Sequence, residues 1–379
     1  MYQDFIDFAR KTFSTEEFIP LHAPIFFGNE KKYLNECIDS TFVSSVGKFV
    51  DKFESDVAKF TGAKHAIATT NGTAALHIGL LMAGVTKEDE VITQPLTFIA
   101  TCNAISYIGA HSIFIDVDKE TLGLSAEKLE HFLINNTQII NGDCINKLTK
   151  RKIKAVVPMH TFGFATKIDD IVSVCNKFNI TVVEDAAESL GSYYKGKHTG
   201  RYGLVGAFSF NGNKTITTGG GGMLITDDDL IAKKAKHITT TAKIPHKWEY
   251  EHDMIAYNYR LPNINAALGC AQMENLPRIL DNKNKLAKKY IEFFKEKPIN
   301  YLQGPKDTKP NYWLNAILLE DLEERNLFLE ETNKKGVMTR PIWKLMNTLN
   351  MFKYAQTGNL ENSQWFEQRV VNIPSSVIL

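Results

Sequence analysis

The sequence predicts an α/β protein with a large, mostly parallel sheet domain covered by helices and a smaller α+β domain at its C-terminal end. Two observations over the 379 residues lead to this prediction. Between about residues 66 and 227, short apolar runs alternate with segments of helical apolar spacing, which is typical of parallel strands joined by crossover helices. After about residue 243, aromatic and charged residues mix and the alternation becomes less regular.

Each element of this alternation follows from its own pattern. Apolar runs bounded by polar and turn residues predict strands at 66–70, 90–94, 112–117, 153–159, 180–185, 206–210 and 222–227. Apolar residues at intervals of three or four predict helices at 72–85, 98–110, 126–136 and 168–178. We expect an N-terminal extension at 1–24, a large domain at 25–247 and a small domain at 248–379. The extension should pack on the small domain or on a partner chain.

The composition excludes several classes of protein. The net charge of +1 gives no reason to expect nucleic acid or an anionic membrane as a partner. The five cysteines form no CxxC pair and the histidines show no metal-ligand spacing, so we expect neither disulfides nor a metal site. The N-terminus lacks the apolar core of a signal peptide, and no apolar run reaches the roughly 20 residues of a membrane helix. These features predict a cytoplasmic protein.

Ligands of open α/β sheets bind beyond the carboxyl ends of the strands, so the residues just after the predicted strands are the candidates for a site. The strand 180–185 ends in Asp185, whose carboxylate is either an ion-pair partner or a ligand contact. As a ligand contact it suits pyridoxal phosphate, because an anion beside the pyridine nitrogen keeps that ring protonated.

A polar loop after the strand 206–210 presents Lys214. A surface lysine is solvated, whereas a lysine nucleophile must be neutral and needs a dry or cationic setting. The apolar strand before Lys214 and the glycine run 219–222 after it favour an interior loop. Lys214 is therefore the candidate catalytic residue.

Further candidates follow the other strands. Gly72 and Thr73 stand where a strand meets a helix, and this helix N-terminus either holds a phosphate or is simply capped. Ser209 would add a hydroxyl to the same phosphate. Phe98 is either a core residue or an aromatic stacked on a flat cofactor, and His160 is either a structural histidine or a cofactor contact.

Taken in order, these segments resemble the DegT/DnrJ/EryC/StrS family of sugar aminotransferases, which are fold-type I enzymes that use pyridoxal 5′-phosphate. The resemblance covers most of the chain, from SSVGKFVDKFE at 44–54 to IPSS at 373–376. It rests on NGTAAL, TFIATCNA, MHTFGFATKIDD, VVEDAAESLGS, FSFNGNK, GGGGM and YNYRLPNINAALGCAQ in this order.

The resemblance implies a role for each matching residue. Lys214 matches the lysine that forms a Schiff base with the cofactor, and Asp185 matches the partner of the pyridine nitrogen. Glu188 stands where the family often has glutamine, which commonly contacts the ring hydroxyl, so this contact stays open here. The other implied cofactor contacts are Gly72, Thr73 and Ser209 for the phosphate, Phe98 for stacking, and His160 near the cofactor and substrate.

The family also implies a homodimer with shared active sites. Asn258 matches a residue that reaches the phosphate of the neighbouring subunit's cofactor. Arg260 lies close by and is either a second such contact or a structural arginine at the interface.

The function implied by the resemblance is transfer of the amino group of L-glutamate to a nucleotide-linked keto sugar. The segment VVEDAAESLGSYYKGKHTG and the N-terminal extension are similar to those of the branch acting in legionaminic acid synthesis. That branch aminates C4 of a UDP- or GDP-linked 4-keto-6-deoxy-N-acetylhexosamine. Amination at C3 and sugar dehydration are the alternatives, and relatives that dehydrate carry histidine where this chain has Lys214.

A protein without catalysis that senses the cofactor, or a nicotinamide-dependent oxidoreductase, fits less well. The chain shows no basic recognition helix or spare domain for a regulator, and ATTNGTAAL lacks the GxGxxG spacing of a dinucleotide site.

Overall fold

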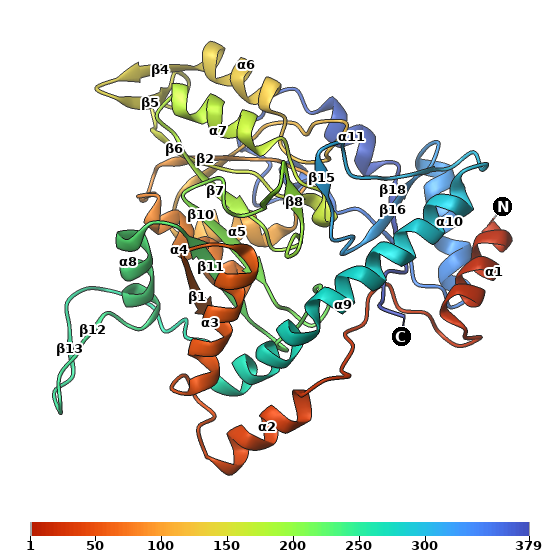
Figure 1. Cartoon of the computed structure of the whole chain (residues 1–379). Coiled ribbons are helices and arrows are strands. Elements are labelled where there is room, and N and C mark those ends of the chain that lie inside the picture. The colour runs from red at the N-terminus through yellow and green to blue at the C-terminus, as the bar shows by residue number, and fades with distance from the viewer. Residues whose placement is uncertain (1, 379) are drawn as a thin grey trace.

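A computed structural model describes residues 2–378 of the chain (Figure 1). Within these residues, a seven-stranded sheet has the strand order β1-β11-β10-β7-β6-β2-β3. Its strands are β1 (His65–Thr69), β2 (Glu90–Thr93), β3 (His111–Phe114), β6 (Ile153–Val157), β7 (Thr181–Asp185), β10 (Val205–Ser209) and β11 (Gly222–Thr226). Each predicted strand is present, and its bounds differ from the prediction by no more than a few residues.

The sheet is mostly parallel, as the sequence predicts. Neighbouring strands pair in parallel from β10 through β7, β6 and β2 to β3. The exception is β11, which runs antiparallel to both β10 and β1. The start of β11 therefore lies at the same edge of the sheet as the carboxyl ends of its neighbours.

Helices cover both faces of the sheet. Strand residues that point to opposite faces belong to different apolar clusters, each of which includes residues of the covering helices. Val183, Ala207 and Leu224 pack under one set of helices, and Val182 and Phe208 pack on the opposite face. The first face carries α4 (Gly72–Met82), α5 (Ile99–Tyr107) and α8 (Asp229–Thr239). The second face carries α3 (Lys48–Thr61), α6 (Ala126–Asn136), α7 (Ile168–Lys177) and the first half of α9 (Asn263–Phe294).

A second, antiparallel sheet has the order β14-β16-β18-β17 and is built from the C-terminal part of the chain. Its strands are β14 (Asn300–Tyr301), β16 (Asn315–Leu318), β17 (Arg340–Pro341) and β18 (Val370–Ile373). The long helix α9 runs from the first sheet to this second one (Figure 1). Helix α1 (Tyr2–Phe13) packs here against the end of α9 and against α10 (Leu322–Lys334), with Phe5 5.1 Å from Phe328 between ring centroids. Of the two arrangements expected for the N-terminal extension, packing on the C-terminal part of the chain is the one seen within the described residues.

Several smaller elements were not predicted from the sequence. The hairpin β4 (Thr137–Ile140) to β5 (Asp143–Asn146) leaves the main sheet, and the hairpin β12 (Lys243–Ile244) to β13 (Glu251–His252) projects far from the body (Figure 1). Other such elements are α2 (Glu30–Asp39), β8 (Tyr193–Tyr194), β9 (Lys197–His198), β15 (Thr308–Lys309), α11 (Glu361–Glu367) and 3₁₀ turns at Thr161–Gly163 and Met346–Thr348, and the helices α3 and α8 were not predicted either. From residue 2 to residue 378, helices long and apolar enough to cross a bilayer are absent.

Candidate active site

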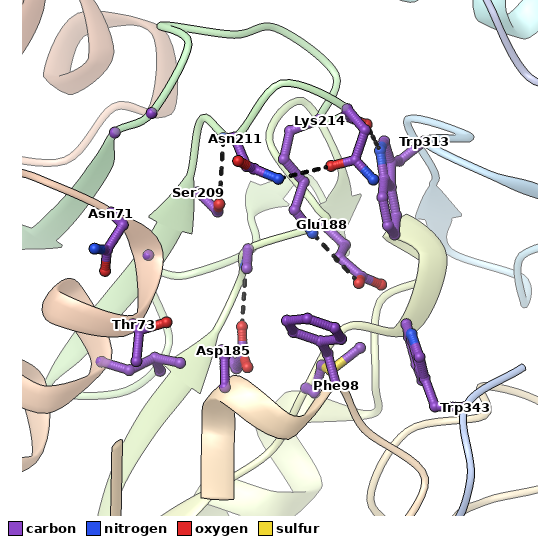
Figure 2. A pocket seen from close by; sticks show the side chains of 18 residues that line it. Asn71, Thr73, Phe98, Asp185, Glu188, Ser209, Asn211, Lys214, Trp313 and Trp343 are labelled. Atoms are coloured by element: carbon purple, nitrogen blue, oxygen red, sulfur yellow. Dashed lines mark hydrogen bonds and ion pairs between the residues drawn. The ribbon is translucent and has the colours of Figure 1, made fainter. Parts of the chain in front are cut away.

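A cavity of about 300 Å³ opens at the carboxyl edge of the main sheet. The ends of β7 and β10, the start of α4 and the loop before β11 surround it, so the sheet topology alone brings these segments together. The sequence-predicted residues that line it are Gly72, Thr73, Phe98, Asp185, Glu188, Ser209 and Lys214 (Figure 2).

Lys214 reaches into this cavity from the loop that follows β10. Its side chain is only 13% exposed, and its Nζ lies 3.5 Å from Glu188 Oε1. The same nitrogen stands 4.0 Å from the centroid of the Trp313 ring. Trp313 is held in turn by its Nε1, which donates a 2.7 Å hydrogen bond to the Asn213 carbonyl beside the lysine. The apolar ring and the burial give Lys214 the dry setting that an amine nucleophile requires.

Glu188 forms part of the cavity wall below Lys214 (Figure 2). Its Oε2 accepts a 2.8 Å hydrogen bond from the Phe162 amide, which leaves Oε1 facing the lysine. Burial raises the pKa of Glu188 to about 7, against the opposing effect of the nearby Lys214 charge. The carboxyl can therefore gain or lose a proton near neutral pH.

Asp185 is the last residue of β7, and its carboxylate points into the cavity. Thr101 Oγ1 donates a 2.6 Å hydrogen bond to Oδ2, and the Ala187 amide donates a 3.1 Å hydrogen bond to Oδ1. Burial raises the pKa of Asp185, and these two hydrogen bonds oppose the rise. Both donors are neutral, so this buried carboxylate suits a cationic partner such as a protonated pyridine nitrogen.

The first turn of α4 and the end of β10 approach each other closely beside the cavity. A Cβ added to Gly72 would lie 2.8 Å from Ser209 Cβ and 3.3 Å from the Phe208 carbonyl oxygen, so only glycine fits. Asn71 caps the helix, with Oδ1 accepting a 2.8 Å hydrogen bond from the Ala74 amide. This cap satisfies one backbone amide, and the earlier amides of the turn, at the positive end of the helix dipole, are free to bind an anion.

Phe98 and Trp343 line the side of the cavity opposite Ser209 (Figure 2). Phe98 precedes α5 and is 51% exposed, which is unusual for a core phenylalanine and leaves its ring free to stack on a ligand. Trp343 rests on the ring of Phe162, with 5.2 Å between the ring centroids. These aromatic side chains give the cavity a surface on which a flat aromatic ligand can stack.

The structure does not bring His160 into the cavity. Its ring is fully buried, with Nε2 2.9 Å from Glu184 Oε2 and with Nδ1 accepting a 3.2 Å hydrogen bond from the Thr166 amide. Successive residues beyond β6 point to opposite sides, and it is Met159 that lines the cavity. The structural interpretation of this histidine is therefore the one that the contacts support.

Asn258 and Arg260 also lie outside the cavity of their own chain. They follow the projecting β12–β13 hairpin, and Arg260 Nε donates a 3.0 Å hydrogen bond to Asn258 Oδ1. Their expected contact with a partner subunit stays a prediction.

Sequence reasoning missed Trp313, Asn211 and Asn213 as lining residues. Trp313 comes from the segment before β16, about 100 positions beyond Lys214, and carries no local signal for this site. Asn211 and Asn213 belong to the loop that presents Lys214. Their closeness to the lysine in the sequence could have identified them as lining residues. As for metals, the side chains of residues 2–378 include no cluster of His, Cys, Asp or Glu suited to an ion.

Comparison with known proteins agrees with this geometry. Residues 26–379 match the family model of the DegT/DnrJ/EryC1/StrS aminotransferase family. The chain is 38% identical to GDP-perosamine synthase of Escherichia coli O157:H7 over 365 residues, which cover 95% of this chain and 93% of the relative.

Solved structures give the same result for the fold. PseC of Helicobacter pylori, an aminotransferase involved in the biosynthesis of pseudoaminic acid, superposes with a TM-score of 0.85 at 25% identity and covers 94% of each chain. The Escherichia coli GDP-4-keto-6-deoxy-D-mannose-3-dehydratase with bound hydrated PLP superposes with a TM-score of 0.82 at 22% identity over 95% of each chain, a likeness of fold alone. The chain belongs to the DegT/DnrJ/EryC1/StrS aminotransferase family, whose enzymes depend on pyridoxal phosphate.

Proposed function

We propose that this enzyme transfers the amino group of L-glutamate to C4 of a nucleotide-linked 4-keto-6-deoxy-N-acetylhexosamine, with the cofactor bound to Lys214. The observation that carries the proposal is the buried amine of Lys214, which faces the cavity between Glu188 and Trp313. A lysine at this position supports transamination, because it can both bind the cofactor covalently and carry a proton.

The lining residues fit pyridoxal phosphate group by group. When bound, this cofactor supplies an electron-withdrawing ring that stabilises negative charge on the carbon attached to the amine. Asp185 would hold the proton on the ring nitrogen, and Phe98 would stack on the ring face. The amides of Gly72 and Thr73 and the hydroxyl of Ser209 would bind the phosphate at the start of α4.

Lys214 also performs the proton transfers in this proposal. With the donor bound, its neutral Nζ would remove the proton from the α-carbon of L-glutamate. In the second half of the reaction, the same nitrogen delivers a proton to C4 of the sugar. Burial beneath Trp313 excludes water from this nitrogen, so the proton passes between Nζ and carbon.

GDP is the nucleotide that we assign to the substrate, and the N-acetyl group rests on the sequence similarity to the legionaminic acid branch. The relative at 38% identity is named for a GDP-linked amino sugar. We further propose a homodimer in which Asn258 reaches the phosphate of the partner's cofactor. The position of Asn258 after a projecting hairpin, outside its own cavity, supports this arrangement.

Incubation of the cofactor-loaded protein with L-glutamate and a panel of keto sugars tests the proposal. The panel contains the GDP- and UDP-linked 4-keto-6-deoxy-N-acetylhexosamines and the GDP-linked 4-keto-6-deoxymannose. We expect one 2-oxoglutarate per amine formed at C4, and kcat/KM at least about tenfold higher for GDP than for UDP, because the two bases differ by a whole ring and even one methylene in a binding pocket is worth about 10–200-fold. An amine at C3, or loss of water from the sugar without an amine, would contradict the proposed reaction.

Gly72→Ala should weaken binding of the cofactor through its phosphate. The new Cβ would press on Ser209 Cβ at 2.8 Å, and overpacking of this kind costs about 1–3 kcal/mol, or roughly a fivefold loss of affinity at the lower end. A titration of cofactor-free protein, followed by absorbance, measures the change. Gly212→Ala is the matched control, because a Cβ there meets no heavy atom within 4 Å. Equal affinities for the two variants would show that the phosphate lies elsewhere.

A further inference from the structure

The two oxygens of the Glu188 carboxyl have different tasks. Oε2 is fixed by the Phe162 amide at 2.8 Å, and the side chain is only 2% exposed, so the carboxyl cannot turn away. Oε1 is thereby held 3.5 Å from Lys214 Nζ, at the outer limit of a hydrogen bond. Such contacts are often long in ligand-free sites and tighten when the site is occupied.

The charges in the cavity favour movement of a proton between these two groups. Two buried carboxylates, Asp185 and Glu188, face one amine, Lys214. Asp185 is already stabilised by the hydroxyl of Thr101 and the amide of Ala187, whereas Glu188 has one backbone donor and the lysine. When the lysine loses its charge, Glu188 is therefore the carboxylate that protonation stabilises most. Its pKa of about 7, raised by burial, agrees with this.

We propose that Glu188 is the proton partner of Lys214: its Oε1 holds the Lys214 ammonium in the cofactor-free protein and takes one proton from Nζ when the cofactor binds. One N–H bond of the ammonium breaks and one O–H bond forms on Glu188, so the ion pair becomes a neutral amine and a neutral carboxyl. The amine would then condense with the aldehyde of the cofactor, and its two remaining hydrogens would leave with the aldehyde oxygen as water. The inference rests on the proposed function and deepens it, because it assigns the proton of the same lysine. Glu188 is thus a positioning residue that acts through Lys214.

Glutamine, which the family often has here, cannot perform this task. The Phe162 amide requires an acceptor, so the oxygen of a glutamine would turn toward it and the NH₂ group would face Lys214. That NH₂ is a donor and does not titrate, so it can neither hold an ammonium nor accept its proton. Glu188→Gln keeps the size of the side chain and its bond to Phe162, and we expect the variant to fold.

Infrared difference spectroscopy tests the proposal directly. Cofactor-free protein at pH 8 is mixed with pyridoxal 5′-phosphate, without glutamate or sugar, and the carbonyl stretch of protonated carboxyl groups is recorded. At this pH Glu188 is mostly ionised before binding, because its pKa lies near 7. We expect the wild type to gain one protonated carboxyl on binding, and Glu188→Gln to gain none.

The control is Glu54→Gln, which changes a similar pair outside the cavity. Glu54 Oε1 accepts from the Ala68 amide at 2.8 Å and from Lys236 Nζ at 2.6 Å, and this variant should keep the wild-type signal. Visible absorbance of the same samples reports whether the cofactor has bound. Binding without a new protonated carboxyl, or with the same band in Glu188→Gln, overturns the inference alone. Absence of binding in the wild type overturns the proposed function as well.

Discussion

Lys214→Ala should abolish covalent binding of the cofactor and lower kcat by at least about 10²–10⁴-fold. This is the contribution of a single positioned proton carrier, and the loss of the covalent bond adds to it. The variant has no side-chain amine at the cavity, because the other described residues that line the cavity include no lysine. Absorbance of the loaded protein reports the bond, and single-turnover measurement with glutamate reports the proton transfer.

A lysine in a similar local setting, but on the surface, provides the control for this variant. Lys195 pairs with Asp169 at 2.6 Å and stands 5.1 Å from the centroid of the Tyr194 ring, so it too has a carboxylate and an aromatic neighbour. Lys195→Ala should leave the spectrum and kcat unchanged. If Lys214→Ala kept the wild-type spectrum, the assignment of the lysine would be wrong.

Asp185→Asn should slow both half-reactions by about 10²–10³-fold, which is the usual loss when one preorganised electrostatic partner is removed. Asparagine keeps the shape of the side chain but cannot hold a proton on the ring nitrogen by charge. Stopped-flow spectra with glutamate alone and with keto sugar alone measure the two halves separately. Asp118→Asn, a carboxylate that caps backbone amides outside the cavity, is the control.

The same substitution should stabilise the cofactor-free protein at neutral pH. Burial raises the pKa of Asp185 in the folded state, so the folded protein binds this proton more tightly than the unfolded chain does. The contribution of the group to stability is then present at low pH and is lost as pH rises through the folded pKa. Asparagine avoids that loss, and thermal unfolding at two pH values shows it. Near-normal turnover together with unchanged stability would remove Asp185 from its role.

The sequence predicted the strands of the main sheet and their mostly parallel arrangement, because unambiguous apolar runs alternate with helical segments, but it did not single out the opposite direction of β11. An apolar run such as 222–226 reads the same in either direction. The direction of β11 follows from its connection to β10, since the chain from 210 to 221 contains no crossover helix and a parallel return needs one. The β4–β5 hairpin had its own signal in Asn141–Gly142, a turn pair whose φ values of 51° and 85° suit that dipeptide.

The cavity could be predicted in part, because strand ends are local features and contacts across the chain are not. Asp185, Ser209 and Lys214 follow strands of one sheet, so topology alone brings them to one edge. Trp313 comes from the segment before a strand of the second sheet, and no rule of strand order predicts that this segment reaches the cavity. Successive residues after β6 point to opposite sides, so a shift of one position decides which side chain faces the cavity. Met159 faces it, and His160 points away into the protein interior.

The bond between the cofactor and Lys214 is the central claim, and borohydride reduction of the loaded protein followed by peptide mapping tests it most directly. Lys283 is the competing site, because it is 1% exposed and burial lowers its pKa to about 7. Its Nζ, however, donates to the carbonyls of Tyr312, Trp313 and Ser375 and is not free to react. We expect the reduced cofactor on the peptide that contains Lys214. The cofactor on the Lys283 peptide, or on no peptide, would contradict the account.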